Sequence, residues 1–145
     1  MLRRVVDKAR HAIALRELEA LLIGRTLTAR ETEGQWNLIS DGEAYIHAWS
    51  WRLVGDNHIV VASEDHEHRF GLPKPINAVE KFNTALGGEP VARVEVSSIT
   101  GDLAILFSGG IRLEIPTRSS GYESWSVGRK EDFSTLFVGA NGGFL

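Results

Sequence analysis

Two histidines near the middle of the chain are the strongest indication of chemistry in this sequence. Residues 64–68 read Glu-Asp-His-Glu-His, and in an extended chain Glu64, His66 and His68 project to the same side. Two imidazoles and one carboxylate form a ligand set that suits a divalent metal ion. The run precedes Pro73, and a solvated loop is the reading that the sequence favours. A small metal-binding protein or metal-dependent enzyme is therefore an alternative hypothesis, with Glu64, His66 and His68 as its ligands.

A second unusual stretch is the strand predicted at residues 44–54, which is rich in aromatic side chains. Strict alternation places one set of residues on a single face of this strand: Tyr45, His47, Trp49, Trp51 and Leu53. Tryptophan and tyrosine dominate interface hot spots, so this face is a candidate surface for a protein partner. The opposing interpretation, which the sequence favours, is that helices cover the face and the tryptophans belong to the core.

Composition excludes several functional classes. The 145 residues contain no cysteine, which excludes disulfides and thiolate metal sites and is consistent with a reducing, cytoplasmic location. The net charge of −3 argues against a nucleic-acid partner, and no apolar run approaches the roughly 18 residues that a membrane-spanning helix requires. No phosphate-binding loop or nucleophile motif is present, so we assign no catalytic residue and expect no cofactor.

The hydrophobic periodicity predicts an α+β fold in one domain, residues 1–145. Helices are expected at about Val5 to Ile23 and Pro75 to Leu86, each followed by glycine. Short strands fill the rest, separated by turn signals such as Asp41-Gly42 and Gly109-Gly110, which favour antiparallel hairpins. The predicted strands are Thr26 to Arg30, Trp36 to Ser40, Ala44 to Val54, Ile59 to Ser63, Val91 to Ser97, Leu103 to Phe107, Ile111 to Ile115, Tyr122 to Val127 and Ser134 to Val138.

The order of helix then strands occurs twice, which suggests an internal duplication with halves at about 1–72 and 73–145. Residues 38–42 match residues 106–110 in pattern, and residues 51–55 parallel 125–128 with a tryptophan at the start of each. Two such halves are expected to share a mixed or antiparallel sheet, with both helices packed on one side of it.

The segment Gly121, Tyr122, Glu123, Ser124, Trp125 follows a strand, a glycine turn and a second, alternating strand. In this respect residues 102–127 resemble a group of small, uncharacterised bacterial α+β proteins with a Tyr-Glu-x-Trp motif. The resemblance implies no established enzyme activity, and some comparable acidic proteins serve as immunity partners of bacterial toxins. The first half of the chain departs from the motif. A structural account is available as well, in which Trp125 packs in the core and Glu123 accepts hydrogen bonds.

The sequence therefore favours a non-catalytic protein-binding module, in which an acidic chain neutralises a basic partner in the manner of an immunity protein. The nominated contact residues are Trp49, Trp51, Glu64, Asp65 and Glu67. Besides the metal-site alternative, a structural homodimer formed through the aromatic strand face remains open as a further hypothesis.

Overall fold

The structure is a computed structural model that describes residues 2–140 and 143–144, and it is an α+β fold built mostly from antiparallel strands. A single turn of 3-10 helix, Ser63–Asp65, precedes the second helix. The helices and strands are α1 (Leu2–Leu22), β1 (Leu27–Thr32), β2 (Gln35–Ser40), β3 (Ala44–Ala48), β4 (Arg52–Gly55), β5 (His58–Ala62), α2 (Ala78–Leu86), β6 (Val91–Val96), β7 (Leu103–Phe107), β8 (Arg112–Ile115), β9 (Trp125–Arg129), β10 (Thr135–Ala140) and β11 (Gly143–Phe144).

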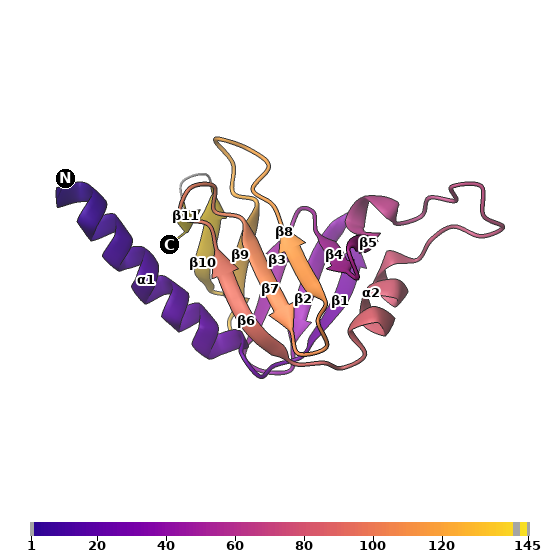
Figure 1. The fold of residues 1–145 in the computed structure, drawn as a ribbon, viewed down its shortest axis with the longest axis horizontal. Coiled ribbons are helices and arrows are strands. Elements are labelled where there is room, and N and C mark those ends of the chain that lie inside the picture. The colour runs from indigo at the N-terminus through magenta and orange to yellow at the C-terminus, as the bar shows by residue number, and fades with distance from the viewer. Residues whose placement is uncertain (1, 141–142, 145) are drawn as a thin grey trace.

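The strands form two antiparallel sheets rather than the one shared sheet that the sequence suggests (Figure 1). Sheet A has the order β1-β2-β3-β9-β10-β11, and sheet B has the order β5-β4-β8-β7-β6. Each sheet thus combines three consecutive strands from one half of the chain with strands from the other half. The two sheets meet where β1 and β6 begin, because the N–H of Gly24 donates to the carbonyl of Val91 and the N–H of Val91 donates to the carbonyl of Arg25, both at 2.8 Å.

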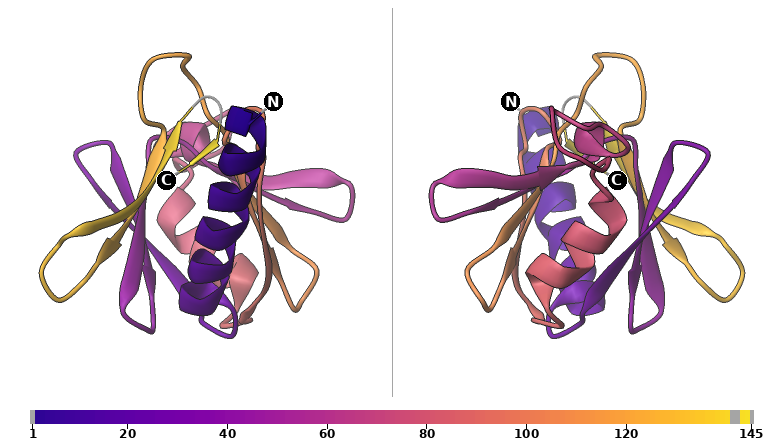
Figure 2. Two further views of the ribbon diagram at one scale, coloured as in Figure 1. Left: turned by 90° about the vertical axis from the view of Figure 1, so that its left-hand side faces the viewer. Right: turned by 90° about the vertical axis from the view of Figure 1, so that its right-hand side faces the viewer.

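The two helices pack on different strands. Helix α1 packs on β6 of sheet B, whereas α2 packs on β1 of sheet A and also contacts β5. Figure 1 shows α1 and α2 at opposite ends of the molecule, and the end-on views of Figure 2 show both helices in the space between the two splayed sheets. Helix α2 covers the edge of β1 through Asn83, whose Oδ1 accepts the N–H of Ala29 at 2.8 Å. That contact satisfies a backbone donor that an open sheet edge would expose.

Helix α2 begins three residues later than the sequence suggests. Its N-cap is Asn77, whose Oδ1 accepts the N–H of Glu80 at 3.1 Å, so Pro75 lies before the helix rather than in its first turn. An asparagine cap satisfies a free N–H at the helix start, whereas a proline merely tolerates that position. The C-terminal end is as predicted, because Gly87 takes the left-handed conformation with φ of 55°.

The predicted strand 44–54 is two strands, β3 in sheet A and β4 in sheet B. Ala44, Ile46 and Ala48 of β3 face the core, and the larger Tyr45 and His47 point outward. Inward and outward positions do not continue in register from β3 to β4, because the chain changes sheets between them. The aromatic side chains that the sequence places on one face are therefore divided between the surface and the core.

The core lies between the sheets and extends onto both helices. Trp51 packs edge-on against Trp36 and against Phe82 of α2, with ring centroids 5.0 Å apart in both pairs. Leu18 and Leu22 of α1 are fully buried in the same cluster. Edge-to-face aromatic pairs of this kind add to the free energy gained by burying their area. Among the described residues, no helix is long and apolar enough to cross a membrane.

Candidate functional site

The chain crosses between the two sheets in two places, and these two crossovers lie side by side. Residues 49–51 lead from β3 to β4, and residues 116–124 lead from β8 to β9. The backbone N–H of Trp49 donates to the carbonyl oxygen of Ser124 at 3.2 Å, which joins the two segments. Both stretches that the sequence marks as unusual, the tryptophan-rich strand and the Tyr-Glu-x-Trp motif, therefore meet at one place.

Trp49 is the tryptophan that the fold leaves in solvent. Its side chain is 57% exposed, whereas Trp36, Trp51 and Trp125 are each at most 4% exposed. The indole contacts the ring of His47 edge-on, with centroids 6.0 Å apart. Of the two tryptophans nominated as partner contacts, Trp49 is therefore available on the surface, and Trp51 is a core residue that contacts no partner in this fold.

The motif residues divide between surface and core. Tyr122 is 78% exposed and Glu123 is exposed beside it, while Ser124 and Trp125 are buried. The indole N–H of Trp125 donates to the carbonyl of Gly101 at 2.8 Å. Gly121 turns the loop, and its N–H donates to the hydroxyl of Ser119 at 3.0 Å. The core position of Trp125 agrees with the structural account of the motif, and Glu123 is left free to face solvent.

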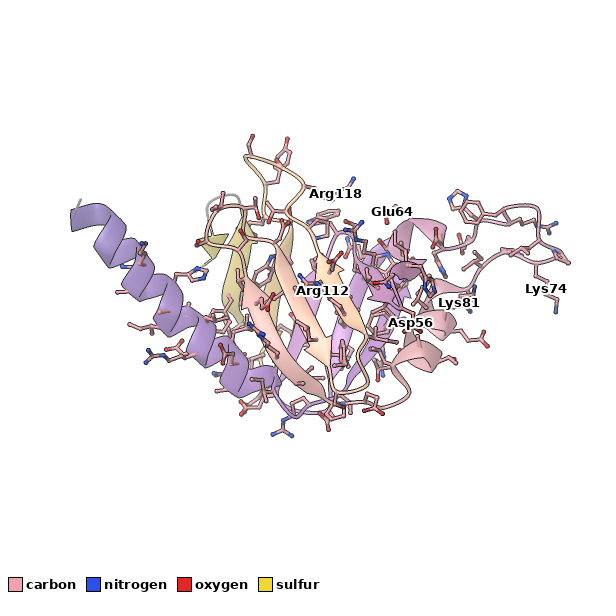
Figure 3. The ribbon with its side chains drawn as sticks, viewed as in Figure 1. Asp56, Glu64, Lys74, Lys81, Arg112 and Arg118 are labelled. Atoms are coloured by element: carbon pink, nitrogen blue, oxygen red, sulfur yellow. The ribbon has the colours of Figure 1, made fainter. Side chains whose placement is uncertain are left out.

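Two segments at the same end of the fold as Trp49 carry acidic residues. Glu123 lies in the neighbouring crossover, and Glu33 lies in the β1–β2 turn, which closes at the same end because Trp36 pairs with Ala48. Arg118 is a cation in the second crossover and is exposed (Figure 3). We name Trp49, Tyr122, Glu123 and Glu33 the crossover surface.

The structure does not bring Glu64, His66 and His68 together as a set of metal ligands. His66 is engaged through Nδ1, which accepts the N–H of Ala78 at 3.0 Å, and its Nε2 faces Glu31 at 3.5 Å. His68 instead stacks on Phe70, with ring centroids 5.6 Å apart. Within the described part of the chain, no three His, Asp or Glu side chains are grouped to hold a metal ion. The alternation argument failed because the 3-10 turn and the following bend replace the extended chain that it assumes.

Three carboxylates were named from the sequence as partner contacts, and the structure gives them different hydrogen bonds and exposure. Asp65 caps the end of β5, because its Oδ2 accepts the N–H of Ala62 at 2.9 Å. Glu64 is exposed, and its Oε2 accepts the hydroxyl of Ser63 at 3.1 Å. Glu67 is exposed at the start of the loop that follows. Glu64 and Glu67 are therefore available to a partner, whereas Asp65 is engaged in a hydrogen bond at the end of β5.

An open groove of about 440 Å³ lies on the outer face of sheet B, behind the first crossover. Arg52 of β4, Arg112 and Glu114 of β8, Ile59 of β5, Glu64 and Asp102 line it. Figure 3 labels Arg112 and Glu64 on this side of the molecule. The volume falls within the range of about 300–1,000 Å³ typical of ligand pockets.

A row of alternating charges crosses the outer face of sheet B at the groove. Nε of Arg52 lies 2.6 Å from Oε1 of Glu114, and Nε of Arg112 lies 2.9 Å from Oε2 of the same carboxylate. Arg112 also reaches Glu95 of β6 at 3.6 Å, and Arg93 pairs with Glu95 at 3.1 Å. Ala104 of β7, which pairs with both Glu114 and Glu95, is small enough to let these side chains meet above it.

Glu114 is held in its ionised form by these arginines. Partial burial raises the pKa of its carboxyl, but the hydrogen bonds and charges of Arg52 and Arg112 outweigh burial and lower the pKa below the ordinary value. The pKa of Asp132 is also lowered, chiefly by hydrogen bonds from the hydroxyl and the N–H of Ser134. Both shifts favour the charged carboxylate, which suits ion pairing; a general acid requires the opposite shift.

The arginines and glutamate of the groove were missed from sequence, although a signal for them exists. The strands 91–96 and 111–115 read Val-Ala-Arg-Val-Glu-Val and Ile-Arg-Leu-Glu-Ile. Each has Arg-x-Glu with an aliphatic residue between and after the two charged ones, so alternation places both charged residues on the solvent face. Two such strands in one sheet predict cross-strand ion pairs.

Comparisons with known protein families, with curated proteins and with solved structures find no match to this chain. The crossover surface and the groove therefore rest on the chain's own geometry.

Proposed function

We propose that this protein is a non-catalytic binding module that holds a basic protein partner through the crossover surface. The observation that carries the proposal is the exposure of Trp49 on a fixed backbone, since a hydrogen bond to Ser124 ties its strand end to the neighbouring crossover. Moving an exposed indole from water into a partner's apolar pocket lowers the free energy of the complex. Tryptophans are accordingly enriched among the residues that dominate binding energy at interfaces.

The charge of the surface favours a basic partner. Glu123 lies in the crossover that is hydrogen-bonded to Trp49, Glu33 lies in the β1–β2 turn at the same end of the fold, and the whole chain carries a net charge of −3. Carboxylates at the rim of an interface accelerate encounter with a cationic protein and select against acidic ones. Tyr122 adds a second exposed ring with a hydroxyl that can pair with a polar group of the partner.

The class of partner that fits this chemistry is a basic protein toxin, with this chain as its cytoplasmic neutraliser. An immunity protein must bind fast and tightly, and electrostatic steering combined with an aromatic anchor supplies both. The resemblance of residues 102–127 to immunity-like proteins points the same way, because Tyr122 and Glu123 of that segment belong to the crossover surface.

We further propose that the chain arose by duplication of a helix followed by five strands. The support is the strand order, in which β1-β2-β3 continue into β9-β10 and β6-β7-β8 continue into β4-β5. Each half contributes its first three strands to one sheet and its next two to the other. On this account the two crossovers are equivalent segments of the two halves, which explains why they share one end of the molecule.

The test uses the basic proteins encoded next to this chain in its genome, purified and titrated one by one by calorimetry. We expect one of them to bind, more weakly as salt is raised, and to lose at least about tenfold in affinity, or about 1.4 kcal/mol, on Trp49→Ala. The matched control is Phe133→Ala, which removes an aromatic side chain that is also exposed, at 76%, and lies outside the crossovers. Binding that survives Trp49→Ala together with Glu123→Gln would refute the crossover surface as the site.

A further inference from the structure

A protruding loop between β5 and α2 is a preorganised arm. The arm comprises residues 67–76, and it leaves the body of the molecule at the right of Figure 1. Backbone hydrogen bonds close its base, since the N–H of Glu67 donates to Ile76 and the N–H of Ile76 donates to His68, both at 2.8 Å. The N–H of Leu72 also donates to the carbonyl of Arg69 at 2.8 Å, which turns the tip. A segment held in this way loses little entropy when it binds.

The arm presents apolar and basic side chains to solvent. Phe70 is 66% exposed and Leu72 is 50% exposed. Arg69 and Lys74 are exposed beside them, and Figure 3 shows Lys74 at the far end of the arm, away from the sheets. No ion pair involves either cation among the contacts of the described residues. Two large apolar residues and two unpaired cations on one short loop are the features of a contact surface.

The groove on sheet B carries the complementary charge. Its lining holds the guanidinium groups of Arg52 and Arg112, and both of these already bind Glu114. Two further carboxylates of the lining have no cation. Glu64 accepts the hydroxyl of Ser63, and Oδ1 of Asp102 accepts the N–H of Thr117 at 2.8 Å. The groove thus combines two unpaired acids with the exposed apolar side chain of Ile59.

We propose that a second copy of this chain occupies the groove, with its arm placing Arg69 and Lys74 against Glu64 and Asp102. The arm starts three residues after Glu64, so arm and groove adjoin on the same copy. Two copies related by a twofold axis then exchange arms reciprocally, and the assembly closes at a dimer rather than growing into a chain. The groove is lined by none of the four residues of the crossover surface, so this homodimer and the binding of a basic partner use different residues.

The proposal is tested by charge reversal in the full chain, with mass followed by sedimentation between about 1 and 300 µM. The arm variant is Arg69→Glu with Lys74→Glu. The groove variant is Glu64→Lys with Asp102→Asn, which retains the acceptor for Thr117. Arg16→Glu on the exposed face of α1 is the control, and circular dichroism establishes that each variant is folded.

We expect the native chain and the control to dimerise, and each reversed variant alone to lose at least about tenfold in dimer affinity. An equimolar mixture of the two variants is expected to dimerise again, because each reversed arm then meets a reversed groove. A native chain that remains a single copy throughout the range overturns the proposal. So does a dimer that persists in either variant, or a mixture that is not rescued. The proposal is also overturned if this chain stays monomeric and a different, basic protein binds in its groove.

Discussion

The backbone N–H of Trp49 lies 3.2 Å from the carbonyl oxygen of Ser124 and donates to it, although 75 positions separate the two residues in sequence. This bond joins the places where the chain changes sheets. It also sets the orientation of the strand end from which the Trp49 indole projects. The backbone that carries the exposed indole is thereby hydrogen-bonded to the neighbouring crossover.

Trp49 and Trp51 are expected to differ sharply in their contribution to stability. Trp51→Ala removes the ring that packs on Trp36 and Phe82 and leaves a cavity, so the free energy of unfolding should fall by about 3–5 kcal/mol. Trp49→Ala should change it by less than about 0.5 kcal/mol, because that side chain is mostly in solvent. Urea unfolding followed by circular dichroism measures both, and equal losses would show that Trp49 is also a core residue.

His66 is expected to hold the start of α2. Its Nδ1 accepts the N–H of Ala78, so His66→Ala leaves that donor without a partner and should cost about 1–2 kcal/mol. Hydrogen exchange at the Ala78 amide should accelerate. The matched control is His68→Ala, two residues further on, whose ring stacks on Phe70 in solvent. A control that destabilises the protein as much as His66→Ala would contradict this account.

Glu114 makes the fold sensitive to acid. Because its pKa is lowered in the folded protein, the carboxylate adds stability above its ordinary pKa of 4.5, and this stability is lost as the pH falls through the lower, folded value. Glu114→Gln should therefore cost about 1 kcal/mol at pH 7 and lessen the further loss of stability below pH 4.5. Unfolding free energies measured from pH 7 to pH 2 check this, and parallel curves for the two proteins would exclude it.

The proposed duplication makes a prediction about chain connectivity. If the halves are equivalent, the connection from β5 to α2 corresponds to a link from the C-terminus to α1. A circular permutant that starts at residue 73 and joins the old termini by a linker as long as 63–77 should fold. Its circular dichroism spectrum should match that of the native chain. A permutant that expresses but stays unfolded with linkers of several lengths would count against equivalent halves.

Much of the local structure could be predicted from the sequence. The helix periodicities and the glycine after α2 located both helices, and Leu103–Phe107 is a strand with the predicted bounds. Local patterns carry such information because alternation and caps act over a few residues. The division into two sheets could not be predicted in this way. Residues 44–54 read as one strand by alternation, and only pairing with distant strands places β3 and β4 in different sheets.

For the candidate sites too, residue types could be identified from the sequence, whereas contacts between distant segments could not. Trp49 and the Tyr122-Glu123 pair were found from residue type, but their adjacency depends on a hydrogen bond between the crossovers. The expected grouping of Glu64, His66 and His68 is not seen because His66 turns back to α2, a contact twelve residues along the chain. The Arg52–Glu114–Arg112 cluster draws on two strands that are remote in sequence, and pairing between strands brings it together.

The most direct test of the account asks whether a bound partner covers Trp49. Acrylamide quenching of tryptophan fluorescence reports mainly on this side chain, because the other three are buried. On addition of the basic protein that binds, the quenching constant should fall for the native chain and stay low in both states for Trp49→Phe. A native chain whose quenching is unchanged when saturated with its partner would contradict the crossover surface as the binding site.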